Sequence, residues 1–152
     1  MTLPDIEQLI MHRLPMRLID RPLAVSETEA VAELTVREDI PFVPPGGGLP
    51  AYAGLELMAQ TIGMIDGLRC YNEGLPPKIG FLLGCRRYKV SCDEFAVGTR
   101  LIITVQMVFN GGEMYSFECR IADAGGEELA TATLNVYAPR DPQAFLRTGY
   151  HE

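Results

Sequence analysis

The chain has 152 residues, of which 47% are hydrophobic and 22% are charged, and its formal net charge is −7. This length and composition are typical of one globular domain, so we expect residues 1–152 to form a single domain. The acidic balance argues against a nucleic-acid surface, and no apolar run is long enough to cross a membrane. The N-terminus lacks a basic stretch followed by an apolar run, so the sequence predicts a cytoplasmic protein without a signal peptide.

The four cysteines have neither metal-ligand nor redox-pair spacing, and no histidine lies near any of them in the sequence. We therefore expect reduced, mostly buried thiols, no metal and no cofactor. Cys85 stands beside Arg86 and Arg87, which can lower a thiol pKa, but it has no neighbouring histidine base.

The first third of the chain predicts a short helix, extended structure and a long loop. Residues 5–11 have the spacing of a short amphipathic helix, which Pro15 ends. Extended structure is expected from 16–20, and the small and branched residues of 30–36 favour a strand. A loop rich in proline and glycine follows at 39–48.

An almost wholly apolar helix is predicted from Pro50 to about Gly74, where Gly-Leu-Pro-Pro supplies a cap and a breaker. A helix that is apolar on every side should be buried on every side. Glu56 and Gln60 are four residues apart and share one face of it. A carboxylate in such a place is costly unless it is paired, hydrogen-bonded or protonated, so Glu56 is either a functional group or a satisfied structural one.

Strand-like runs follow the helix. Residues 79–83 lead through a glycine into 87–90, and 101–109 and 114–122 flank an Asn-Gly-Gly hairpin signal. A Gly-Gly turn leads to the last strand, 129–137. One central helix and about five mostly antiparallel strands predict an α+β fold in which the sheet wraps around the helix.

Several motifs carry a family resemblance. Residues 49–60 resemble a Met-Pro-Gly segment followed by Glu and Ala-Gln, and 12–21 look like His-Arg-x-Pro-Phe-x-Leu-x-Asp-Arg. Residues 84–89 and 97–101 are similar to an Arg-Phe-Lys strand and a Pro-Gly-Asp-x-Leu turn. These are motifs of beta-hydroxyacyl-acyl-carrier-protein dehydratases, and they occur here in the same order.

The whole chain resembles most the divergent branch of predicted 3-hydroxyacyl-carrier-protein dehydratases, which includes accessory proteins of aryl polyene synthesis. Residues 82–88 and 134–137 are similar to that branch in particular. The resemblance implies the hotdog fold, a tunnel for an acyl chain on the phosphopantetheine arm of acyl carrier protein, and a dimer with a second copy or another hotdog dehydratase. It also implies a dehydratase that acts on acyl thioesters in fatty acid or polyene-type biosynthesis.

One departure concerns the catalytic histidine, which the family has in the loop before the helix. Here Phe42 stands near that position. Since His151 is the penultimate residue, His12 is the candidate for a histidine base, and we expect it to reach Glu56 across the dimer. The alternative is a structural histidine ahead of the first strand.

Removing water from a 3-hydroxyacyl thioester needs a base for C2, an acid for the leaving hydroxyl and donors for the enolate oxygen. His12 and Glu56 are the expected base and acid. Amides in the first turn of the helix are expected to point at the thioester oxygen. Substrate-binding roles are expected for Gln60, Ala51, Tyr52, Gly54 and Phe42, although Gln60 can equally make a structural bond.

The same resemblance leaves other functions open. Arg87 and Lys89 are expected on one face of a strand, with Arg86 on the other, where they can dock the carrier protein or form a solvated strand edge. An acyl-thioester hydrolase and a non-catalytic acyl-binding subunit of a dehydratase are the alternative functions.

Overall fold

A computed structural model describes residues 2–76 and 81–138. Its elements, in chain order, are α1 (Ile6–Leu9), β1 (Arg21–Val25), β2 (Glu29–Thr35), β3 (Leu49–Pro50), α2 (Ala53–Asn72), β4 (Phe81–Val90), β5 (Glu94–Phe95), β6 (Arg100–Asn110), β7 (Met114–Asp123) and β8 (Glu128–Tyr137). Within these described ranges, neither helix is long and apolar enough to cross a membrane.

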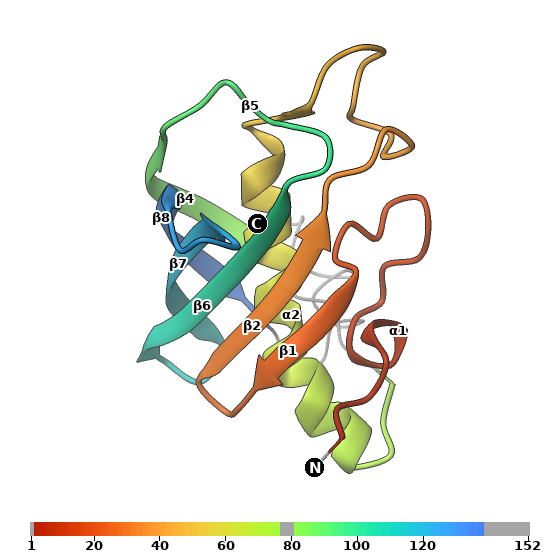
Figure 1. Cartoon of the computed structure of the whole chain (residues 1–152). Coiled ribbons are helices and arrows are strands. Elements are labelled where there is room, and N and C mark those ends of the chain that lie inside the picture. Colours follow the sequence, from red (N-terminus) through yellow and green to blue (C-terminus); the bar gives the residue numbers. More distant parts are fainter. Residues whose placement is uncertain (1, 77–80, 139–152) are drawn as a thin grey trace, which may run out of the picture.

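Six antiparallel strands form one sheet in the order β1-β2-β6-β7-β8-β4, and this sheet curves around α2 (Figure 1). Small side chains on β2 and β8 keep the sheet close to the helix: Ala30, Ala32, Ala130 and Ala132 are all buried. Large apolar side chains of α2, among them Leu57 and Met58, fill the space between the layers. The predicted α+β fold, a hotdog sheet around one central helix, is confirmed.

Both ends of α2 follow from local sequence. Leu49 and Pro50 pair with β5, so the helix begins at Ala53, three residues later than the proline predicted. At the other end Gly74 has a φ of +72°, which lets its N–H donate to the Tyr71 carbonyl at 3.1 Å. The N–H of Leu75 donates to the Cys70 carbonyl at 2.8 Å, so the predicted stop near Gly74 is confirmed.

Four details differ from the sequence-based expectation. The first helix is shorter than 5–11, and 16–20 form no strand because their backbone groups bond to a side chain of α2. The two runs at 79–83 and 87–90 belong, from Phe81 onward, to the single strand β4, and residues 79 and 80 lie outside the described ranges. Finally, α2 is not buried on every side, since the Glu56 side chain is 43% exposed.

Candidate active site

The structure brings His12 and Glu56 together. Glu56 lies in the first turn of α2, and His12 lies in the segment between α1 and β1. Their Nε2 and Oε1 atoms are 3.5 Å apart, and the two side chains are 41% and 43% exposed. The predicted approach of these residues therefore occurs within one chain; the expectation that it needs a dimer contact was wrong. The pair is open to solvent and accessible to a substrate.

Gln60 fixes both the loop and the carboxylate. Its side chain is 1% exposed, and its Oε1 accepts from the N–H groups of Leu18 at 2.9 Å and Ile19 at 3.4 Å. Its Nε2 donates to the Met16 carbonyl at 2.9 Å and to Glu56 Oε1 at 3.1 Å. Because both ends of the amide are used inside the protein, Gln60 orients Glu56 and anchors the segment behind it. It has no polar atom left over for direct substrate binding.

Glycines on α2 allow the N-terminal segment to lie against the helix. A Cβ on Gly67 would collide with the backbone of Leu9, whose carbonyl carbon would be 2.6 Å away. Ile10 packs beside Gly63 less closely: a Cβ on Gly63 would lie 3.6 Å from the Ile10 side chain, which is an ordinary contact distance. This face of α2 is therefore covered by the chain's own α1 segment, and the residues that follow α1 place His12 beside Glu56.

The start of α2 keeps two of its amide groups unused. The N–H of Ala51 donates to the Asp93 carbonyl at 2.9 Å, and the N–H of Gly54 donates to the Ala51 carbonyl at 3.0 Å. Within the described part of the chain, the N–H groups of Tyr52 and Ala53 have no acceptor. The expected amide donors thus narrow to Tyr52 and Ala53, close to the turn that carries Glu56.

Tyr88 is a residue of this region that sequence reasoning missed. Its hydroxyl donates to the Ala51 carbonyl, and a Cβ on Gly54 would collide with that hydroxyl. Burial, with smaller contributions from Cys92 and Cys85, raises the pKa of Tyr88 to about 12. The phenol therefore stays protonated and holds the helix start in place. Gly54 leaves the space that the Tyr88 ring needs to reach the Ala51 carbonyl. The glycine at position 54 was the one feature of the sequence that could have indicated a close neighbour there.

Phe42 and the basic strand lie outside this arrangement. Phe42 is half-buried and packs against the hydrophobic core. Arg86 and Lys89 pair with Thr133 and Thr131 of β8, which are two residues apart, so they share a face of the sheet. The predicted pairing of Arg87 with Lys89 on one face was wrong.

A bulge explains that error. β4 shifts register between Arg86 and Lys89, and Arg87 has a φ of +57°. The extra residue reverses the alternation of side chains and turns Tyr88 toward the helix. Arg86, Arg87 and Lys89 are all exposed.

No group of three potential metal ligands occurs among residues 2–76 and 81–138. The same ranges contain all four cysteines and no disulfide, and Cys70 and Cys119 are buried as thiols. Burial raises the pKa of Cys119 to about 12, which makes it unreactive. His151 lies outside the described residues.

Comparison with known proteins identifies the family. Residues 4–147 match the ApeP-like family, described as ApeP dehydratase. The chain belongs to the ApeP-like dehydratases. It is 32% identical over 134 residues to a 3-hydroxyacyl-[acyl-carrier-protein] dehydratase FabZ of Streptococcus agalactiae serotype V, covering 86% of this chain and 92% of that protein.

Solved structures agree. A chain of the dehydratase heterocomplex ApeI:P from Xenorhabdus doucetiae matches with a TM-score of 0.89 and 27% identity, covering 98% of this chain and 99% of that one. The E. coli PaaI protein of the phenylacetic acid degradation operon shares the fold alone, with a TM-score of 0.58, 16% identity and coverage of 76% and 80%. The dehydratase-like function expected from the sequence is confirmed.

Proposed function

We propose that this ApeP-like chain acts on 3-hydroxyacyl thioesters of acyl carrier protein and eliminates water from them, with His12 as base and Glu56 as acid. The observation that carries the proposal is the 3.5 Å approach of His12 Nε2 to Glu56 Oε1. General acid–base catalysis requires groups within direct contact or one water of the transferred proton. Neutral imidazole and a protonated carboxyl are the starting states that the reaction needs.

The proposed elimination moves one proton to His12 and one proton from Glu56. His12 Nε2 takes a proton from C2, the C–H electron pair forms the C2–C3 double bond, and the C3–O bond breaks. Glu56 gives its proton to the leaving hydroxyl, which departs as water. The imidazolium and carboxylate that remain are neighbours, so the proton returns from His12 to Glu56 directly or through one water and resets the site. The amides of Tyr52 and Ala53 are suited to hold the thioester oxygen as negative charge develops on it.

The exposed cations of strand β4 are suited to bind the acyl carrier protein. Arg86, Arg87 and Lys89 place three cations together on a chain whose net charge is −7. A phosphate such as the one in phosphopantetheine binds well to guanidinium groups. We assign Arg87 and Lys89 to carrier docking, and Arg86 joins them because it shares a face with Lys89.

A second hotdog chain is the partner that the comparisons favour, because the similar structure from Xenorhabdus doucetiae is the dehydratase heterocomplex ApeI:P. In that assembly this chain either supplies the His12–Glu56 pair itself or acts as a binding subunit that completes the partner's site. The first role requires activity that depends on His12, and the second does not.

The test is an assay of 3-hydroxyacyl and acyl thioesters on carrier protein, scored for enoyl product and for released thiol. We expect enoyl product, and a loss of roughly a hundredfold or more with His12→Ala while an acyl-carrier analogue still binds. Met11→Ala, an exposed neighbour in the same segment, is the control and should retain activity. Released thiol as the main product would indicate a hydrolase instead. Enoyl product that appears only with a second hotdog chain, unchanged by His12→Ala, would indicate a binding subunit.

A further inference from the structure

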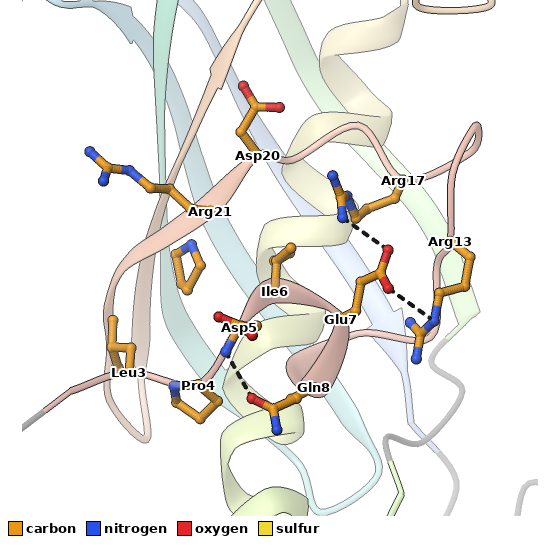
Figure 2. Close-up of a pocket in the computed structure, with 11 residues that line it drawn as sticks. Leu3, Pro4, Asp5, Ile6, Glu7, Gln8, Arg13, Arg17, Asp20 and Arg21 are labelled. Carbon is orange, nitrogen blue, oxygen red and sulfur yellow. Dashed lines mark hydrogen bonds and ion pairs between the residues drawn. The ribbon is translucent and has the colours of Figure 1, made fainter.

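Beside His12, one carboxylate bridges two arginines. Figure 2 shows Glu7 of α1 between Arg13 and Arg17. These residues line a cavity of about 880 Å³ between α1 and the start of β1. Arg17 Nη1 donates to Glu7 Oε2 at 2.9 Å, and Arg13 Nε lies 3.6 Å from Glu7 Oε1. The two arginines stand at the two ends of the turn that follows His12.

The backbone of this turn is linked to the same arginines. The N–H of Arg17 donates to the Arg13 carbonyl at 2.9 Å, which closes the turn. Arg13 Nη1 donates to the carbonyls of Ile10 at 2.9 Å and His12 at 3.0 Å. The guanidinium that Glu7 attracts is therefore also bonded to the backbone on both sides of position 12.

Arg17 depends strongly on this carboxylate. Its side chain is only 19% exposed, and its Nε is buried without an acceptor among the described residues. A poorly solvated cation that loses its counter-charge is left uncompensated, so the structure around it has to move. Glu7 itself is 39% exposed, which makes its replacement compatible with folding.

Gln60, which anchors the N-terminal segment to α2, makes no hydrogen bond to His12 among the described residues. Gln60 bonds to Met16 near the end of the turn and to Leu18 and Ile19 beyond it, so its bonds to this segment begin four residues after His12. We propose that Glu7 is a positioning residue, which holds His12 at Glu56 by clamping Arg13 and Arg17 from the outside. Its effect on turnover rests on the proposed role of His12 as base, whereas its effect on the position of the ring does not.

The chain contains a matched control. Glu33 also bridges two arginines, Arg21 and Arg100, with Arg100 Nη2 at 2.5 Å from Glu33 Oε2, but these residues lie on β1, β2 and β6. Burial acts to raise the pKa of Glu33, and the hydrogen bonds and charges of Arg100 and Arg21 outweigh it and hold that pKa below its usual value. Glu33→Gln thus removes the same kind of bridge without touching the segment that carries His12.

The experiment compares Glu7→Gln with Glu33→Gln, each assayed as folded protein below its melting temperature. For Glu7→Gln we expect kcat to fall roughly tenfold through misplacement of the base, and KM to change by less than about twofold. Glu33→Gln should lower the melting temperature and leave kcat unchanged. Equal losses of kcat in both variants would overturn the proposal.

A second readout works without activity. Only two histidines occur in the chain, so in a His151→Gln background the histidine ring signals of a proton NMR spectrum all come from His12. Glu56→Gln should shift that signal in the otherwise native protein and shift it much less when Glu7→Gln is also present. A shift of the same size in both backgrounds would overturn the clamp. A lost shift with unchanged turnover would support the clamp and refute His12 as the base.

Discussion

Glu56 and Gln60 stand one helical turn apart on α2, yet their surroundings are opposite. The Glu56 side chain is 43% exposed beside His12, whereas Gln60 is 1% exposed and bonds to backbone groups of the N-terminal segment. A group with access to solvent and an imidazole neighbour can do chemistry at low cost to the fold. A buried amide with all its bonds made holds the structure instead.

Glu56→Gln should abolish most activity and leave stability almost unchanged. Loss of a general acid costs roughly a hundredfold or more in turnover, and an exposed ion pair contributes no more than about 1 kcal/mol to the free energy of unfolding. Enoyl formation and a thermal melt measure the two effects. Asp66→Asn, on the same helix with a side chain 39% exposed and an ion pair to Arg69 at 2.7 Å, is the control and should keep activity. Wild-type turnover by Glu56→Gln would refute the assignment.

Tyr88 should be the last tyrosine to ionise. Its pKa of about 12 lies above the ordinary value near 10, so the folded protein holds this proton more tightly than the unfolded chain does. The stability it contributes is complete below pH 10 and is lost as the pH rises from 10 to 12. In an ultraviolet titration of the six tyrosines, Tyr88→Phe should remove the latest step. Tyr52→Phe, at a residue 65% exposed, should leave that step in place.

On the scale of elements, the glycines of α2 decide how closely α1 can approach. Gly63→Ala meets only Ile10 at 3.6 Å, so it should raise the free energy of unfolding by about 0.5–1 kcal/mol through better helix propensity. Gly67→Ala collides with the Leu9 backbone and should destabilise by about 1–3 kcal/mol. Urea unfolding of both variants checks this, and equal effects would contradict the proposed packing.

The bulge in β4 gives the second test at this scale. Arg87 has a left-handed φ of +57°, which costs an arginine roughly 1–2 kcal/mol and a glycine almost nothing. Arg87→Gly should therefore leave stability unchanged or raise it by up to about 1 kcal/mol, while weakening carrier binding by removal of a cation. Arg86→Gly lies in regular pairing with Thr133 and should destabilise by about 0.5–1 kcal/mol. Chemical unfolding should separate the two, and a less stable Arg87→Gly would argue against strain at the bulge.

For the whole molecule, the strand predicted at 101–109 is not an edge of the sheet. That strand is β6, and it lies between β2 and β7. The sheet ends at β1 and β4, and β1 carries Pro22 and a bulge that disfavour further pairing. A two-fold contact through β4 is the simplest way to cover the remaining edge.

Light scattering should give about twice the chain mass of 16.8 kDa. Amide hydrogen exchange should show β4 protected and β1, the other edge, exchanging faster. A stable species of 16.8 kDa across micromolar dilution would exclude the dimer. Protection of β1 with exchange at β4 would place the contact at the opposite edge.

The order of elements was predictable because turns and periodicity are local. The Asn-Gly-Gly hairpin and the stop at Gly74 are written in adjacent residues, and Gly112 and Gly74 have the positive φ values that such turns need. The pairing of His12 with Glu56 was inferred because no other histidine was a suitable base. Its location within one chain depends on how α1 packs against α2, which has no local signal in the sequence. The bulge at Arg87, which sends Tyr88 to the helix start, depends on pairing with β8 and has no local signature.

Because Glu56 and Gln60 have different roles, the two positions should be judged separately in related sequences. In a library selected only for solubility, position 60 would stay glutamine, since a carboxamide offers an acceptor to two amides and a donor to a carbonyl at once, and asparagine is one methylene shorter. Position 56 would accept many different residues under the same selection. A natural sequence that keeps the glutamine and has lost the glutamate is then an intact scaffold without its acid. Genome surveys that score the two residues as one motif would count such scaffolds as enzymes.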